Sequence, residues 1–157
     1  MDENGLFKKV LVITSEGFWL IDCENKTIHV NESLCHMLGY GYHEFIGKSP
    51  LEFVDEENKK IFIEQMGQIN SSKQRSYRIE LRANNGENIP TRFNATTIHD
   101  DEGKALQSFA MVSDMRQEVA LYKALESANE KLKISENLVK TMLDTQENLI
   151  VVTDGKK

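Results

Sequence analysis

Two cysteines and four histidines are the side chains of this sequence best suited to act as nucleophiles, bases or metal ligands. Of these, Cys35 and His36 are neighbours, but adjacent residues of a helix point to different sides, so we expect neither a nucleophile–base pair nor a metal site there. The acidic pairs at 56–57 and 100–101 fall in an expected helix start and an expected turn, where carboxylates are solvated. The sequence therefore predicts no catalytic residue, and a small enzyme is the lower-ranked alternative.

Composition narrows the class of protein further. The chain has 157 residues, of which 39% are hydrophobic and 28% are charged, as is typical of a folded domain in water. A net charge of −6 argues against nucleic acid as a partner. The first residues lack the layout of a signal peptide, no apolar run approaches the ~20 residues that cross a bilayer, and the few cysteines suit a reducing compartment. We therefore expect a cytoplasmic segment without membrane contact.

The elements that would position these side chains begin with a strand pair and a short helix. Residues 18–22 and 27–30 are apolar runs around a polar turn, which predicts two strands. Asn31 follows, and its short side chain can accept a hydrogen bond from a free backbone N–H, which predicts a structural cap for a helix over 32–38. Gly39 ends that helix, because glycine tolerates the left-handed conformation found there.

A longer helix and three strands follow. Asp55 is the expected cap of a helix over 56–69, with Phe62 and Met66 on its buried side. The alternation of apolar and charged residues over 77–83, the turn at Asn85–Gly86, and the runs 89–98 and 105–113 predict three strands. Clustered strands with clustered helices indicate an α+β fold, with a five-stranded antiparallel sheet and helices on one face.

The N-terminal residues 1–15 are predicted to form an amphipathic helix. Leu6, Phe7, Val10 and Leu11 lie at helical spacing. The β-branched residues of the run VLVIT leave a strand as the alternative.

A seam of residues spaced alternately by three and four runs along 117–146. Its members are Glu118, Leu121, Leu125, Ala128, Leu132, Ser135, Val139 and Met142. Such a seam is typical of a coiled coil. We therefore expect a long amphipathic C-terminal helix that projects from the domain and forms a homodimer, with a helix docked on its own domain as the alternative.

Residues 15–116 resemble the PAS family of sensory domains, and we place the domain at 16–116. The resemblance rests on an ordered set of features: the strand pair with its polar turn, Asn31, Gly39–Tyr40, Glu44, Gly47 and the closing Asp114. It implies a five-stranded antiparallel sheet that encloses a ligand cavity together with short helices. It also implies a signal-transduction sensor, whose coiled coil relays the signal to an output domain of histidine-kinase (two-component) or diguanylate-cyclase type.

The resemblance further implies a set of lining residues and a signal junction. The cavity candidates are Trp19, Cys35, Leu38, Phe62, Met66, Phe93 and Met111. For Trp19 and Cys35, simple core packing is the alternative role. Members of the family pass the signal through an Asp-x-Thr-like junction, which is here Asp114–Met115–Arg116. Arg116 stands where the hydroxyl residue is usual, and it could reach a carboxylate instead.

Residues 147–157, ENLIVVTDGKK, align without gaps on residues 16–26, EGFWLIDCENK. Both segments have an acidic residue, an apolar run, an acidic polar turn and a lysine. The match predicts that 147–157 begin a second, truncated PAS domain with its first strand, so that the chain is part of a tandem sensor.

Haem and flavin are the cofactors weighed for the cavity. Haem-binding members of the family usually take their iron ligand from the long helix, which here contains no histidine, and His36 on the earlier helix is a surface or structural residue in the simpler interpretation. Flavin photosensors of the LOV subgroup carry a cysteine in an Asn-Cys-Arg-Phe-Leu-Gln context, which neither Cys23 nor Cys35 has. We therefore expect no cofactor and a small molecule as the candidate ligand. A haem- or flavin-dependent sensor and a ligand-free dimerisation module are the alternatives.

Overall fold

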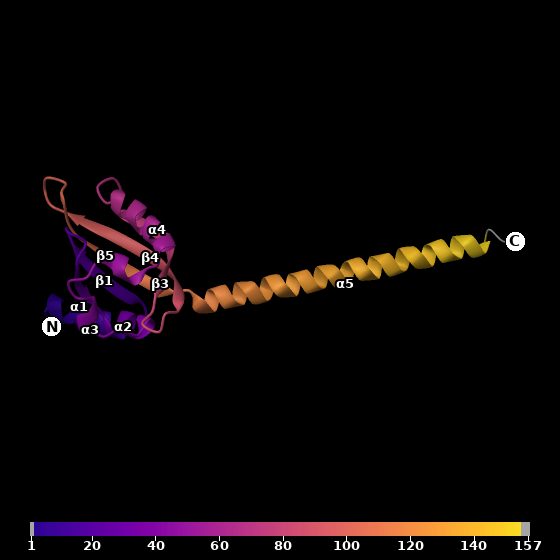
Figure 1. Ribbon diagram of the computed structural model, residues 1–157, viewed down its shortest axis with the longest axis horizontal. Helices are drawn as coiled ribbons and strands as arrows, with labels where there is room; N and C mark the ends of the chain where they lie inside the picture. The colour runs from indigo at the N-terminus through magenta and orange to yellow at the C-terminus, as the bar shows by residue number, and fades with distance from the viewer. Residues whose placement is uncertain (1, 155–157) are drawn as a thin grey trace. The chain divides into compact units, whose positions relative to one another are not determined.

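The computed structural model describes residues 2–154, with the side chains of residues 2–145. Its elements are α1 (Glu3–Ile13), β1 (Gly17–Asp22), β2 (Thr27–Val30), α2 (Glu32–Leu38), α3 (Tyr42–Phe45), the 3₁₀ helix η1 (Pro50–Phe53), α4 (Glu56–Gly67), β3 (Gln74–Arg82), β4 (Asn88–His99), β5 (Ala105–Asp114) and α5 (Arg116–Asp154) (Figure 1). The five strands form one antiparallel sheet in the order β2-β1-β5-β4-β3. This confirms the predicted α+β class. The chain divides after Arg116 into two units, the sheet domain and α5.

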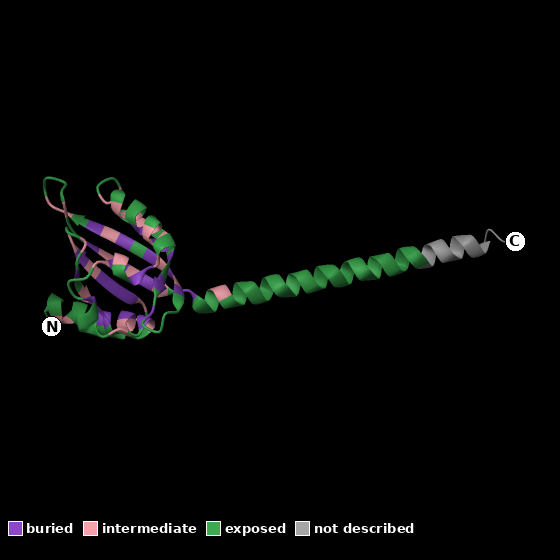
Figure 2. Ribbon diagram, in the orientation of Figure 1, coloured by how far each residue is buried: buried purple, intermediate pink, exposed green. Residues whose placement is uncertain are grey.

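One face of the sheet, called the inner face below, carries the core. The strand register places Trp19 beside Ala110 and Phe93 beside Val112 on this face. The helices α2, α3, η1 and α4 cover it with large apolar side chains that are fully or nearly fully buried: Leu34, Leu38, Phe45, Phe53 and Phe62. Buried and less buried residues therefore alternate along the strands, as Figure 2 shows.

The opposite, outer face is covered in part by α1. Phe18 on β1 stacks on Phe109 of β5, with ring centroids 5.9 Å apart, and Phe7 of α1 meets Phe18 edge-on at 6.0 Å. Phe18 is buried as a result, as is Leu11 on the same helix. The helices α2 to α4 thus lie on one face, and the amphipathic N-terminal helix supplies the cover that the apolar residues of the other face require.

The buried side chain of Asn31 joins three elements. Its Oδ1 accepts hydrogen bonds from the backbone N–H groups of Phe18, at 2.8 Å, and Leu34, at 3.0 Å, so that Asn31 is the N-cap of α2 and also holds the start of β1. Its Nδ2 donates to the carbonyl oxygens of Leu11, at 3.1 Å, and Glu16, at 2.9 Å. Both acceptor positions of Oδ1 and both N–H groups of Nδ2 are therefore hydrogen-bonded, as a buried amide side chain requires.

A second cap fixes α4 against the sheet. Asp55 accepts hydrogen bonds from the backbone and the side chain of Asn58, which hold the pKa of the Asp55 carboxyl below its usual range. The buried Asn58 in turn accepts a hydrogen bond from the backbone N–H of Glu80 on β3, at 3.0 Å. This connection ties the first turn of α4 to β3.

The largest differences from the predicted extents are at the start of β3 and at the end of α5. β3 begins at Gln74 instead of residue 77, because the polar residues before Tyr77 also pair with β4. α5 continues as a helix to Asp154, where a strand was expected from residue 147, and residues 155–157 lie outside the described part of the chain. A helix satisfies its backbone hydrogen bonds internally, whereas a strand needs a partner strand. The second domain stays a prediction.

Within residues 2–154, no helix has both the length and the apolar composition needed to cross a bilayer.

We predict that Asn31→Ala lowers the free energy of unfolding by about 3 kcal/mol, because it removes a helix cap and leaves buried backbone groups without partners. Asn31→Asp is the matched variant, since it keeps the capping oxygen but places a carboxylate oxygen against the carbonyls of Leu11 and Glu16. Urea unfolding followed by the fluorescence of Trp19, the single tryptophan, measures both. If Asn31→Asp is as stable as the parent, the donor side of this network contributes nothing.

Candidate ligand cavity

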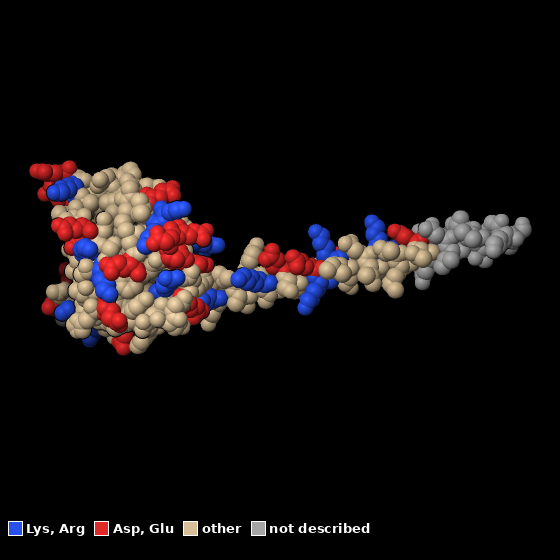
Figure 3. Space-filling view, viewed as in Figure 1, with Lys and Arg blue, Asp and Glu red and all other residues tan. Residues whose placement is uncertain are grey.

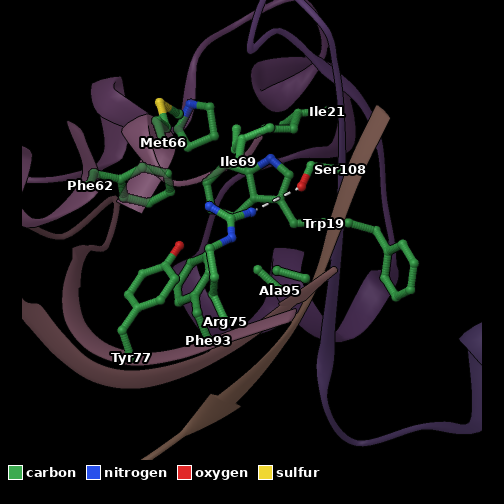
Figure 4. A pocket seen from close by; sticks show the side chains of 13 residues that line it. Trp19, Ile21, Phe62, Met66, Ile69, Arg75, Tyr77, Phe93, Ala95 and Ser108 are labelled. Carbon is green, nitrogen blue, oxygen red and sulfur yellow. Dashed lines mark hydrogen bonds between the residues drawn. The ribbon is translucent and has the colours of Figure 1, made fainter. Parts of the chain in front are cut away.

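A small cavity lies between the inner face of the sheet and α4 (Figure 4). It is lined by Trp19, Ile21, Pro50, Phe62, Met66, Ile69, Arg75, Tyr77, Phe93, Ala95, Ser108, Phe109 and Ala110. Its volume is about 30 Å³, which gives room for about two water molecules. Any occupant that enters without rearrangement is therefore very small.

Aromatic rings form most of the wall. Trp19 meets Phe45 and Phe53 edge-on, each at 5.5 Å, and its indole N–H donates to the hydroxyl of Thr27 at 2.9 Å. The one polar group of Trp19 is thus satisfied within the protein, and the ring offers only an apolar surface to the cavity. Phe93 and Tyr77, from β4 and β3, stack at 5.4 Å on the opposite side.

The guanidinium of Arg75 lies among these rings, as Figure 4 shows. One terminal nitrogen donates to the carbonyl oxygen of Gln65 on α4, and the other donates to the hydroxyls of Thr97, at 3.2 Å, and Ser108, at 3.3 Å. Its Nε is buried and has no hydrogen-bond partner. Burial lowers the pKa of Arg75, but arginine stays protonated at neutral pH. A cation therefore lies at an otherwise largely apolar cavity.

Tyr77 adds a neutral hydroxyl beside this cation. Burial raises the pKa of Tyr77 to about 12, and the positive charge of Arg75 opposes that shift without cancelling it. At neutral pH the side chain is therefore a protonated phenol, which can donate a hydrogen bond.

The end of β5 carries a bidentate ion pair. The Arg116 side chain donates from one terminal nitrogen to Asp114 Oδ2 at 2.6 Å and from Nε to both carboxylate oxygens, at 3.0 and 3.1 Å. The backbone N–H of Arg116, the first residue of α5, donates to Asp114 Oδ1 at 2.9 Å. Burial raises the pKa of Asp114, but hydrogen bonds from Arg116 and its charge outweigh that effect and lower the pKa overall. Asp114 therefore remains a carboxylate and stabilises the first turn of α5.

Comparison with protein families decides the identity of the sheet domain. The family model described as PAS domain matches residues 15–117. The chain belongs to the PAS domain family. No match was found among curated proteins.

Solved PAS structures have the same fold. The PAS domain of a Colwellia psychrerythraea protein matches with a TM-score of 0.68 and 11% identity, over 74% of this chain and 99% of that chain. A domain of a sensory box sensor histidine kinase/response regulator from Geobacter sulfurreducens matches with a TM-score of 0.61 and 14% identity, over 71% and 94%. The PAS domain of an HTR-like protein from Haloarcula marismortui matches with a TM-score of 0.61 and 16% identity, over 71% and 90%. Similarity at these identities shows the fold alone.

The structure brings some of the predicted residues of this PAS domain to the cavity and places others elsewhere. Four line it: Trp19, Phe62, Met66 and Phe93. Leu38 and Cys35, on α2, pack in or against the core outside this lining, and burial raises the pKa of the Cys35 thiol. The expectation for Met111 is corrected by the register: Met111 pairs with Phe18 and Asn94, so it lies on the outer face of the sheet.

Haem and flavin do not fit this PAS cavity. A pocket for a ligand of that size has roughly 300 Å³ or more, ten times the volume found here. The side chain of His36 is 77% exposed and lies 3.7 Å from Glu32, away from the cavity lining. Over the described residues, no group of three or more His, Cys, Asp or Glu side chains is arranged to hold a metal ion.

Ser108, Arg75 and Tyr77 are the polar lining residues that the sequence alone did not single out, and two of them, Arg75 and Tyr77, lie on β3. A signal for them is present, because residues 75, 77, 79 and 81 alternate with exposed residues on β3 and so share one face. Extending the apolar alternation backwards by one step places Arg75 on the inner face.

We predict that Tyr77 makes stability fall at alkaline pH. The unfolded phenol ionises near pH 10.0 and the folded one near 12, so its contribution is fully present below pH 10 and is lost as the pH rises towards 12. The loss is roughly 2 kcal/mol. Urea unfolding across this range, in the parent and in Tyr77→Phe, isolates the effect because other groups titrate equally in both. A pH-independent difference between the two would contradict the burial of Tyr77.

Proposed function

We propose that this chain is a sensor module that binds a small molecule in the cavity and relays its presence through a homodimer of α5 to a downstream output domain. The single observation that carries the proposal is the apolar seam of α5. A sensor that relays its signal through a coiled coil needs a C-terminal helix that pairs with the same helix of a second copy.

The seam is solvent-exposed in one copy of the chain. Leu121, Leu125, Leu132, Val139 and Met142 are 53% to 71% exposed. Charged side chains of both signs lie along α5 with uncharged stretches between them (Figure 3). Exposed apolar residues at alternating spacings of three and four are stabilised when two such helices pair, which removes the seam from water.

β5 is the element that supports a relay within the domain. Ser108 on β5 contacts Arg75 at the cavity, and Asp114 at the end of the same strand binds Arg116. The two positions are about 20 Å apart along an extended strand. A shift of β5 caused by a ligand would therefore reach the first residue of α5 through covalent and hydrogen-bonded neighbours.

Relatives of the fold support an output domain of the histidine-kinase type. The Geobacter sulfurreducens structure is described as a domain of a sensory box sensor histidine kinase/response regulator, and a Burkholderia thailandensis structure is described as a sensory box histidine kinase/response regulator. We therefore propose a kinase output, with a diguanylate cyclase as the second type, and a cytoplasmic location.

We predict that Leu132→Glu raises the dissociation constant of the dimer roughly 100-fold or more, because two leucines leave the interface and each contributes about 1.5–3 kcal/mol of burial. Sedimentation equilibrium of the whole chain measures this constant. Ile134→Glu is the matched control, since Ile134 is 64% exposed against 60% for Leu132 but lies off the seam. A monomeric parent chain, or equal effects of the two substitutions, would refute the seam as the dimer interface.

A further inference from the structure

We propose that the cavity binds a short-chain monocarboxylate of about the size of acetate, whose carboxylate is held by Arg75. The inference rests on the proposed sensor function, for which it names the chemical class of the ligand.

The charge of Arg75 favours an anionic ligand. Removing a guanidinium from water is costly unless an anion or a full set of hydrogen bonds compensates for it. No acidic side chain of residues 2–145 forms an ion pair with Arg75, whose partners are one carbonyl and two hydroxyls, all uncharged. A bound carboxylate would supply the missing negative charge.

One edge of the Arg75 guanidinium has the geometry of a carboxylate partner. The buried Nε has no partner, and the neighbouring terminal nitrogen has hydrogen bonds of 3.2 and 3.3 Å, at or beyond the long end of the usual range. These two nitrogens form one edge of the guanidinium, which matches the two oxygens of a carboxylate once the ligand displaces the contacts with Thr97 and Ser108 and Arg75 turns this edge towards the cavity. The hydroxyls of Thr97 and Ser108 also hydrogen-bond to each other at 3.1 Å, and Ser108 donates to the carbonyl oxygen of Thr96, so both hydroxyls keep a partner when a carboxylate replaces them at Arg75.

The size and the walls of the cavity select a short aliphatic acid. Its volume of about 30 Å³ excludes ring systems. Apart from Arg75, Ser108 and the hydroxyl of Tyr77, the lining is apolar, with Trp19 and Phe93 among its rings, so a methyl or ethyl group is accommodated better than a second charge. Arg75 itself is partly exposed.

A structural role explains part of this arrangement but not all of it. Gln65 is in the last turn of α4, where its carbonyl oxygen accepts from the backbone N–H of Gln68 as well as from Arg75, and a cation at this end of a helix is favourable. That contact accounts for one terminal nitrogen. It does not account for the unpartnered Nε or for the nitrogen that faces the hydroxyls.

The experiment is a titration of the whole chain with sodium acetate, followed by the fluorescence of Trp19. Trp19 is the single tryptophan and lines the cavity, so the signal is local to the site. Sodium chloride of equal ionic strength is the baseline, and acetamide is the neutral molecule of the same shape. We expect a saturable response to acetate and an affinity for acetamide that is roughly 10-fold weaker or more.

Three variants complete the test. Arg75→Met is expected to weaken acetate binding roughly 10-fold or more. Arg75→Lys keeps the positive charge but lacks the two neighbouring nitrogens that can bind both carboxylate oxygens, so it is expected to bind acetate with intermediate affinity. This variant also tests the proposal if Arg75→Met does not fold. Arg78→Met, on the exposed outer side of β3, removes the same charge from the same strand and should bind like the parent. Equal affinities for acetate and acetamide, unchanged binding by both Arg75 variants, or no saturable response to formate, acetate or propionate would overturn the proposal.

Failure of this inference is distinguishable from failure of the sensor function. Native mass spectrometry of the chain purified from cells reports whatever has remained bound. A bound neutral compound, together with an intact α5 dimer, would refute the carboxylate and leave the sensor proposal standing. A monomeric chain would instead refute the sensor proposal, whatever acetate does.

Discussion

The hydrogen-bonded ladder of β5 is the constraint on which the rest of this PAS domain depends. β5 pairs with β1 along one edge and with β4 along the other, and within residues 2–154 it is the strand that joins the β1–β2 hairpin to the β3–β4 hairpin. Those hairpins carry opposite walls of the cavity, with Trp19 on one and Arg75 on the other. The cavity therefore forms only when β5 has paired on both sides, and the strand that closes the cavity is also the strand that leads into α5.

Most of the fold could be predicted because its signals are local. Asn31 caps α2 with a side chain that the next turn requires, and the turn at Asn85–Gly86 has the positive φ of 85° at Gly86 that only glycine adopts easily. The elements that differ lack such signals. The β3 residues before Tyr77 are all polar, so no apolar residue marks the start of β3, and the apolar run from residue 147 suits a strand or a helix equally until a partner strand is known.

The cavity could be predicted only in part, because its polar residues depend on contacts that are distant in sequence. Aromatic residues such as Phe93 were identifiable from the strand pattern, but Met111 depends on register, and a shift of one residue moves a side chain to the other face. Arg75 is a charged residue near a strand end, which usually means a surface position. Its hydroxyl partners Thr97 and Ser108 lie 22 and 33 residues further along the chain, so their meeting follows from the sheet and not from any motif.

The central claim is that occupation of this cavity changes how two copies of α5 pair. The most direct measurement is the distance between nitroxide labels at Glu130→Cys on α5, by pulsed electron paramagnetic resonance, in a chain that also carries Cys23→Ser and Cys35→Ala. Spectra are taken without ligand and with saturating sodium acetate. The account predicts that acetate shifts the distance distribution in the parent background and not when Arg75→Met is added. The same distribution with and without acetate, under conditions in which Trp19 fluorescence reports full binding, would contradict it.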